Sequence, residues 1–109
     1  MATTYKVLGQ SAPAAATLTS AYTVPAATSA VVSTIHVLNR SGSTDTIRIA
    51  VRPAGETVEN KHYLVYDLGI TSGQFLTLTV GVTLATTDVI SVYSRQGLCS
   101  FNIFGSEIS

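Results

Sequence analysis

The sequence predicts an all-β protein, folded as a single antiparallel β-sandwich of about eight strands in a jelly-roll-like arrangement. Three observations favour this class: abundant Thr, Ser, Ala and Val, alternation of apolar and polar residues, and short strand-like segments separated by turn formers. β-Branched side chains lose rotamer freedom in a helix but fit the half-buried surface of a sheet. The length of 109 residues fits one domain, residues 1–109, with a modest core.

The clearest alternation is the run Thr-Ile-Arg-Ile-Ala-Val-Arg at residues 46–52. Its aliphatic residues point to one side of a strand, whereas Arg48 and Arg52 point to the other. We therefore expect one face of this strand in the core and the other in solvent. The Pro-Ala-Gly sequence at residues 53–55 ends the strand as a turn.

The remaining predicted strands are residues 5–8, 18–24, 30–39, 63–68, 74–80, 89–94 and 98–104. The segment 39–45 is rich in turn formers and joins two of these strands, which predicts a hairpin between residues 30–39 and 46–52. Residues 56–61 form a polar, helix-tolerant segment, for which we expect one helical turn or an ordered loop.

Charge is sparse, because 11% of the residues are charged against 46% that are hydrophobic, and the formal net charge is zero. The six Lys and Arg residues are scattered singly, so the chain lacks the basic stripe that binds nucleic acid. No apolar run approaches the ~18 residues of a membrane span, and no signal peptide opens the chain, which predicts synthesis in a cytoplasm and no membrane partner. Weak charge repulsion favours association into an oligomer.

The residues that carry catalysis are missing or isolated, so we expect no enzyme, no cofactor and no metal site. The single cysteine, Cys99, lies in an apolar strand and is expected to be a buried, inert thiol. The two histidines, His36 and His62, are expected to have structural or surface roles. Together they would bind a metal only with a third ligand brought by folding or by a symmetry mate.

The carboxylates fall in turn-like contexts. Asp45 and Asp88 each precede a β-branched strand, where an Asx turn explains them. Glu56 and Glu59 are expected in a solvated loop, because the other ligands of a calcium loop are absent.

A carbohydrate-binding platform of exposed aromatic rings is the alternative that the tyrosines raise. Tyr63 and Tyr66 are three residues apart in a predicted strand, so they face opposite sides unless a bulge intervenes. We therefore expect one tyrosine in the core and the other at an interface, with its hydroxyl on a partner.

Three parts of the chain resemble small virion proteins of tailed bacteriophages, including cyanophages. These are Tyr-Lys-Val-Leu-Gly-Gln-Ser at residues 5–11, Ile-Arg-Ile-Ala-Val-Arg-Pro at 47–53, and the C-terminal Asp-Val-Ile-Ser-Val-Tyr at 88–93 with Phe-Asn-Ile-Phe-Gly-Ser-Glu at 101–107. The resemblance implies a capsid decoration (cement) protein that bridges capsomers on the particle surface. It also implies the major capsid protein or other virion proteins as partners.

We expect such a protein to act as a homo-oligomer, with a trimer favoured because linked contacts gain avidity. A receptor- or glycan-binding module of a head or tail fibre, or another tail or neck structural protein, is the alternative. Two observations select the residues expected to touch a partner: two arginines lie opposite the core and three residues adjoin the polar loop. These residues are Arg48, Arg52, Lys61, His62 and Tyr63.

Overall fold

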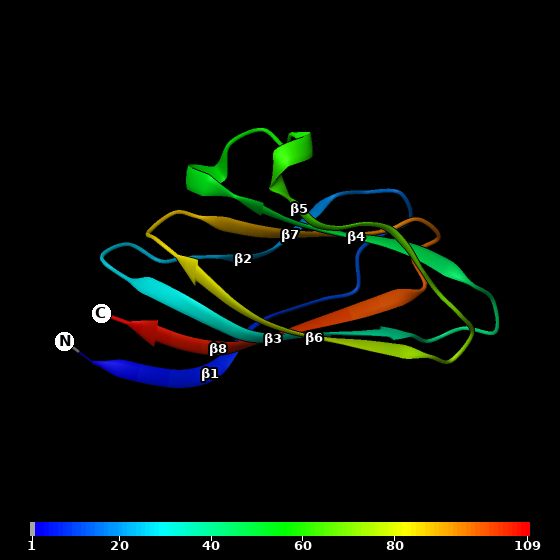
Figure 1. Ribbon diagram of the computed structural model, residues 1–109, viewed down its shortest axis with the longest axis horizontal. Coiled ribbons are helices and arrows are strands. Elements are labelled where there is room, and N and C mark those ends of the chain that lie inside the picture. The colour runs from blue at the N-terminus through cyan, green and yellow to red at the C-terminus, as the bar shows by residue number, and fades with distance from the viewer. Residues whose placement is uncertain (1) are drawn as a thin grey trace.

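The computed structural model describes residues 2–109 as two four-stranded antiparallel sheets packed face to face (Figure 1). The all-β sandwich predicted from the sequence is confirmed, as is the number of strands. The strands are β1 (Thr3–Ser11), β2 (Thr19–Thr23), β3 (Ser29–Asn39), β4 (Asp45–Arg52), β5 (Tyr63–Ile70), β6 (Phe75–Leu84), β7 (Val89–Ser94) and β8 (Cys99–Ile108).

The strand orders β1-β8-β3-β6 and β2-β7-β4-β5 are those of a jelly roll. Figure 1 separates the two layers, with β2, β7, β4 and β5 in the upper one. The edges of the first sheet are β1 and β6, and those of the second are β2 and β5. The two chain ends are adjacent, because Ala2 and Ser109 exchange backbone hydrogen bonds of 2.7 and 2.9 Å (Figure 1).

The predicted hairpin between residues 30–39 and 46–52 is wrong, because β3 and β4 lie in different sheets. Their connection is a corner that crosses the sandwich. The side chain of Asn39 holds it, since its Nδ2 donates to the carbonyl oxygens of Ser43 at 2.7 Å and Ile70 at 2.8 Å. Crossing over lets the aliphatic faces of both strands meet across one core, which a flat hairpin would not do.

The core lies between the sheets and consists of the residues that alternate inward on each strand. Its largest fully buried apolar side chains are Phe101, Ile35, Ile47, Ile49, Ile90, Ile103, Val24, Val32, Val37 and Val92. Cys99 is fully buried among them, as predicted. Burial raises the pKa of its thiol to about 11, and the nearby Asp45 carboxylate adds to the shift.

The two sides of the sandwich differ in how tightly they close. On the β1–β2 side the backbones touch: a Cβ added to Gly9 would lie 2.2 Å from the carbonyl oxygen of Ala21. Tyr22 also donates a 2.6 Å hydrogen bond to Glu107, which receives a second one from Lys6 at 3.2 Å. On the β5–β6 side, inward residues such as Leu76 and Leu78 are only half-buried.

A segment of ten residues, 53–62, leaves β4 and folds over the outer face of the β2-β7-β4-β5 sheet (Figure 1). It contains two short 3-10 turns, η1 (Pro53–Gly55) and η2 (Asn60–His62), so the expected turn at 53–55 and ordered loop at 56–61 are confirmed. The segment buries Ala50 and Ser91, which face outward from the sheet. The outer face of β4 is thus only partly in solvent.

Candidate functional site

Arg52 fastens the 53–62 segment to the sheet. Its Nε donates to the carbonyl oxygen of Glu56 at 2.7 Å and its Nη2 to that of Gly55 at 3.0 Å, while Nη1 reaches the Ser91 hydroxyl at 3.1 Å. Because all three partners belong to its own chain, the Arg52 guanidinium has a structural role and holds the loop against the sheet. Arg52 therefore lies on the face opposite the core, as the alternation predicted, but each of its three guanidinium nitrogens already donates a hydrogen bond within the chain.

His62 and Lys61 are neighbours in η2 with opposite environments. His62 is 5% exposed; its Nδ1 accepts the backbone N–H of Glu59 at 3.0 Å, and its Nε2 lies 3.3 Å from the Glu56 carboxylate. Lys61 is exposed. Of these two predicted contact residues, Lys61 is the one with a side chain that a partner can reach without rearrangement.

Arg48 projects from the outer face of β4 and is held from three sides. Its Nε and Nη2 bind the two carboxylate oxygens of Asp67 at 2.6 and 3.3 Å. Its guanidinium lies 4.3 Å from the ring centre of Tyr66 and 4.6 Å from that of Tyr93. The hydrogen bond from Arg48 lowers the pKa of Asp67 and raises that of Arg48.

Tyr63 and Tyr66 do not face opposite sides, because β5 contains the bulges that would change the alternation. The β4–β5 register shifts between Ile47 and Ile49 and again between Ile49 and Ala50, and Asp67 adopts a φ of 52°. The two rings meet edge to face with centres 4.8 Å apart. Together with Asn60 they line one hollow of about 450 Å³. Neither ring belongs to the buried core, contrary to the expectation that one would.

The other sheet, β1-β8-β3-β6, presents an outer face without a charged side chain among the described residues. We call it the neutral face. Its members alternate with core residues in the strand register: Tyr5, Val7, Gln10, Val31, Thr34, His36, Leu38, Phe75, Thr77, Thr79, Thr83, Ser100, Asn102, Phe104 and Ser106. Its aromatic residues include Tyr5, 85% exposed, and Phe75, 63% exposed, which stacks on His36 at 5.4 Å.

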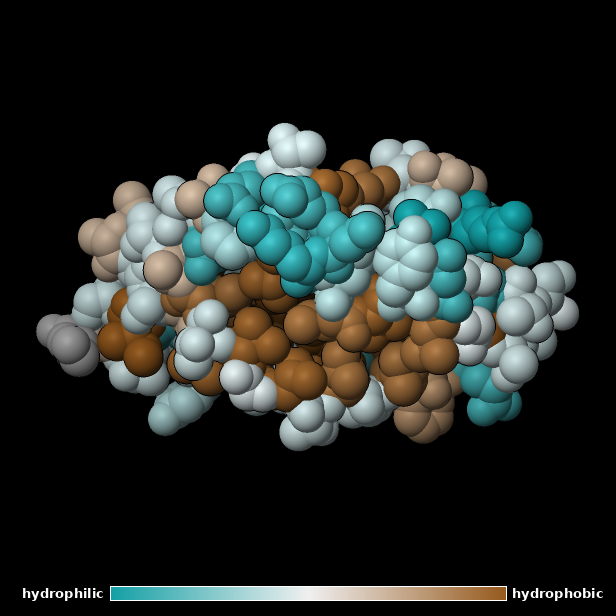
Figure 2. Space-filling view, turned by 45° about the horizontal axis from the view of Figure 1, so that its top comes forward, coloured by the Kyte–Doolittle hydropathy of each residue, from teal (hydrophilic) through white to brown (hydrophobic). Residues whose placement is uncertain are grey.

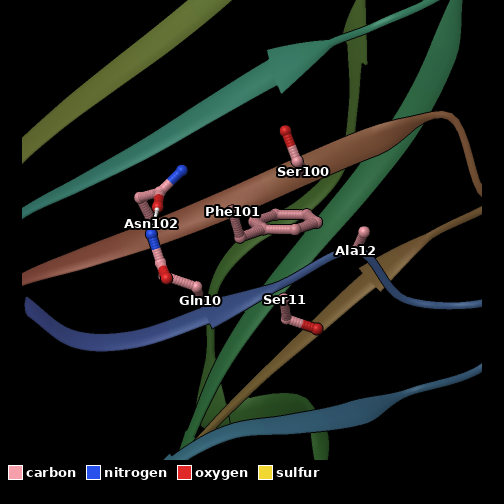
Figure 3. Close-up of a pocket in the computed structure, with 6 residues that line it drawn as sticks. All are labelled: Gln10, Ser11, Ala12, Ser100, Phe101 and Asn102. Carbon is pink, nitrogen blue, oxygen red and sulfur yellow. Dashed lines mark hydrogen bonds between the residues drawn. The ribbon is translucent and has the colours of Figure 1, made fainter.

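Two shallow hollows lie along the β1–β8 pair on this side of the molecule. The first, of about 340 Å³, is lined by Gln10, Ser11, Ala12, Ser100, Phe101 and Asn102 (Figure 3). Figure 3 shows the side chains of Gln10 and Asn102 pointing toward each other, where Gln10 Nε2 donates a 2.7 Å hydrogen bond to Asn102 Oδ1. The second, of about 490 Å³, is lined by Tyr5, Lys6, Val7, Val31, Ser33, Phe104, Gly105 and Ser106, so Lys6 adds one charged residue at its rim.

Large hydrophobic side chains are exposed mainly on edge strands. Six of the eight with the greatest exposure belong to β1, β5 or β6: Tyr5, Val7, Leu64, Tyr66, Leu68 and Phe75. The strands β2 and β6 contain no charged residue at all. In Figure 2 a band of hydrophobic residues runs across the middle of the face, below the hydrophilic residues that gather over the η1–η2 part. Edge strands of proteins that stay monomeric usually carry charges that block pairing.

Asp45 and Asp88 each link two segments that are distant in the sequence, so their role is wider than the Asx turns expected for them. The buried Asp45 accepts hydrogen bonds from the backbone N–H groups of Thr46, Gln96 and Leu98 at 2.7, 2.9 and 3.1 Å, and from the Ser94 hydroxyl. Burial by itself raises the pKa of Asp45, but these hydrogen bonds outweigh it and the pKa is lowered.

Asp88 makes the second link. Its two carboxylate oxygens accept the backbone N–H groups of Ala54 and Ala85, each at 2.9 Å. Asp88 thereby ties the start of the 53–62 segment to the β6–β7 turn. Both aspartates have structural partners on separate loops, which sequence spacing alone does not reveal.

Residues 2–109 contain no group of three or more His, Cys, Asp or Glu side chains placed to hold a metal ion. Within the same residues, no helix is long and apolar enough to cross a membrane. Among known proteins, neither a family model nor a curated sequence matches this chain.

Proposed function

We propose that this chain is a non-enzymatic structural subunit of a tailed-bacteriophage particle, a capsid decoration protein that bridges capsomers from the particle surface. The observation that carries the proposal is the combination of a neutral face with hydrophobic, almost uncharged edge strands. The assignment to a virion depends on the resemblance of three segments to phage virion proteins. Burial of these surfaces in an assembly would explain why they lack charge.

The neutral face is suited to burial against another protein. Interfaces between subunits are depleted of charge at their centres and enriched in aromatic side chains, as this face is with Tyr5, Phe75 and Phe104. The molecule measures 45 × 27 × 19 Å, so its broad side is large enough for a footprint of about 800 Å² per partner. The Ser and Thr hydroxyls that fill the rest of the face can exchange hydrogen bonds without the cost of burying charge.

The edge strand β6 adds a second means of association. Its outer backbone N–H and C=O groups have no neighbouring strand within the described sheet, and none of its ten residues is charged. Such an edge can accept an extended strand of another subunit or of a capsid protein. We favour a homotrimer, because each further contact with the capsid is then effectively intramolecular and avidity rises by roughly 10² to 10⁴.

A single particle-level experiment tests the location. Phage particles purified from the host that carries this sequence are analysed by mass spectrometry and cryo-electron microscopy. We expect many copies per particle, as trimers at joints between capsomers. Absence from purified particles overturns the proposal, and density on a fibre or at the neck moves the protein to the alternative class.

A solution experiment tests the surface. We expect the wild-type protein to sediment as an oligomer, and Thr77→Lys on the neutral face to weaken self-association at least ~10-fold because it buries an unpaired charge. Thr57→Lys is the matched control, because Thr57 is exposed on the 53–62 segment, away from this face. A wild-type protein that remains monomeric at about 100 µM, or equal effects of the two variants, contradicts the proposed interface.

A further inference from the structure

The hollow beside Tyr63 and Tyr66 has the composition of a ligand site, and it lies on the sheet opposite to the neutral face. It is about 450 Å³ in volume, which falls in the range of small-molecule sites. Its lining side chains supply two aromatic rings, two phenol hydroxyls and the carboxamide of Asn60. Tyr66 is 56% exposed, so a ligand can reach its ring.

The aromatic wall is fixed before any ligand arrives. Arg48 lies against the Tyr66 ring at 4.3 Å and is itself anchored by two hydrogen bonds to Asp67. Tyr63 packs against Tyr66 at 4.8 Å, nearly perpendicular with an interplanar angle of 79°. A wall that is braced in this way loses little conformational freedom on binding, so more of the contact energy appears as affinity.

The chemistry of the lining selects the ligand. None of the three side chains is a carboxylate, an amine or a guanidinium, and the neighbouring Arg48 is paired with Asp67. The lining itself therefore offers no counter-charge to an anionic or cationic ligand. The ligand that suits aromatic faces together with hydroxyl and amide groups is neutral, with an apolar face and a hydroxylated rim.

We infer that this hollow binds a neutral carbohydrate: a sugar ring of a glycan stacks its C–H face on one of the two nearly perpendicular tyrosine rings, and Asn60 and the phenol groups bind its hydroxyls. The bulged register of β5 is what creates the wall, because regular alternation would send the two rings to opposite faces. This inference goes beyond the proposed structural role. A decoration protein that also holds host-surface glycans would tether the particle to a cell.

The test is a chemical-shift titration of the ¹⁵N-labelled full chain with neutral hexaoses of glucose, mannose and galactose in turn. We expect at least one to shift the resonances of Asn60, Tyr63 and Tyr66, with a Kd on the order of 1 mM, as befits an open site for one sugar ring. Tyr66→Ala should weaken binding at least ~10-fold, and Tyr66→Phe should retain most of it because the stacking face survives.

Two further variants keep the inference falsifiable if Tyr66→Ala disturbs the Arg48 contact. Asn60→Ala, at an exposed position, should weaken binding several-fold with the spectrum otherwise unchanged. Thr57→Ala, at an exposed position of the same segment that does not line the hollow, should have no effect. No shift at the hollow with about 20 mM of any hexaose overturns the inference, as does binding of hexaproline in place of the sugars. Neither result bears on whether the chain is found in particles.

Discussion

Replacing Asp45 by Ala should destabilise the protein more than any surface substitution, because this carboxylate closes the corner between β4 and the β7–β8 turn. Asp45 is 1% exposed, and Ser94, which donates to it, is fully buried. The methyl group of alanine leaves the Ser94 hydroxyl and the N–H groups of Thr46, Gln96 and Leu98 without this acceptor.

The magnitude follows from the number of donors and their access to water. A buried donor left without a partner costs about 1–3 kcal/mol. Gln96 is exposed, and Thr46 and Leu98 are half-buried, so water replaces part of what these three N–H groups lose. The fully buried Ser94 hydroxyl bears its whole loss, which together with the partial losses gives a total of about 3–4 kcal/mol. That is a large share of the ~5–15 kcal/mol that stabilises a typical domain.

The assay is urea unfolding followed by circular dichroism, with the free energy of unfolding extrapolated to water for each variant. Asp67→Ala is the matched control, because it removes a carboxylate from an exposed ion pair with Arg48 and should cost much less than Asp45→Ala. A loss below about 1 kcal/mol for Asp45→Ala, or one equal to the control, would refute the reasoning.

Three further predictions concern acid stability, close backbone approach and the thiol. The lowered pKa of Asp45 means that its stabilisation is present above the unfolded-state pKa near 3.8 and is lost as pH falls through the folded value, so Asp45→Asn should flatten the decline in stability below about pH 5. Gly105→Ala should cost at least ~3 kcal/mol or prevent folding, because its Cβ would lie 2.0 Å from the Val31 carbonyl oxygen, whereas Gly81→Ala meets nothing within 4 Å and should change stability by less than ~1 kcal/mol. Cys99, buried and with its pKa raised to about 11, should react with a disulfide reagent at neutral pH only at the rate of unfolding.

Each of these has an outcome that contradicts it. An unchanged acid profile for Asp45→Asn means that other carboxylates dominate acid unfolding. Equal stability of Gly105→Ala and Gly81→Ala, measured by thermal melting, means that β3 and β8 can move apart at little cost. Rapid modification of Cys99 in the native protein, measured by thiol absorbance, means that the β8 end of the core opens locally.

The strands were predictable because their periodicity depends on local sequence. The alternation at residues 46–52 correctly placed Ile47 and Ile49 in the core and Arg48 outside it. Strand ends were less predictable: β8 continues to Ile108 through Gly-Ser-Glu, which has no apolar alternation and is ordered by pairing with both β1 and β3.

The connection at residues 39–45 and the orientation of Tyr63 and Tyr66 differ from prediction for the same physical reason, since both depend on contacts between distant residues. Turn formers at residues 39–45 fit a hairpin and a corner equally well, and the Asn39 bond to the Ile70 carbonyl decides for the corner. Tyr63 and Tyr66 share a wall because two residues of β5 are extra in its register with β4. A bulge of this kind leaves only a weak local signal, here the left-handed Asp67 next to Tyr66.

The position of β8 determines when the protein can fold during its synthesis. This strand is the last in the sequence, yet it lies inside its sheet, with β1 on one side and β3 on the other. While β8 is still inside the ribosome, the strand β1 has no neighbouring strand in its sheet. The Asp45 carboxylate also lacks the hydrogen bonds that the N–H groups of Gln96 and Leu98 donate in the folded protein. The domain can therefore fold only after β8 has left the ribosome, and the uncharged β6 segment stays exposed to other nascent chains until then. A cell that makes many copies quickly would need chaperone capacity in proportion.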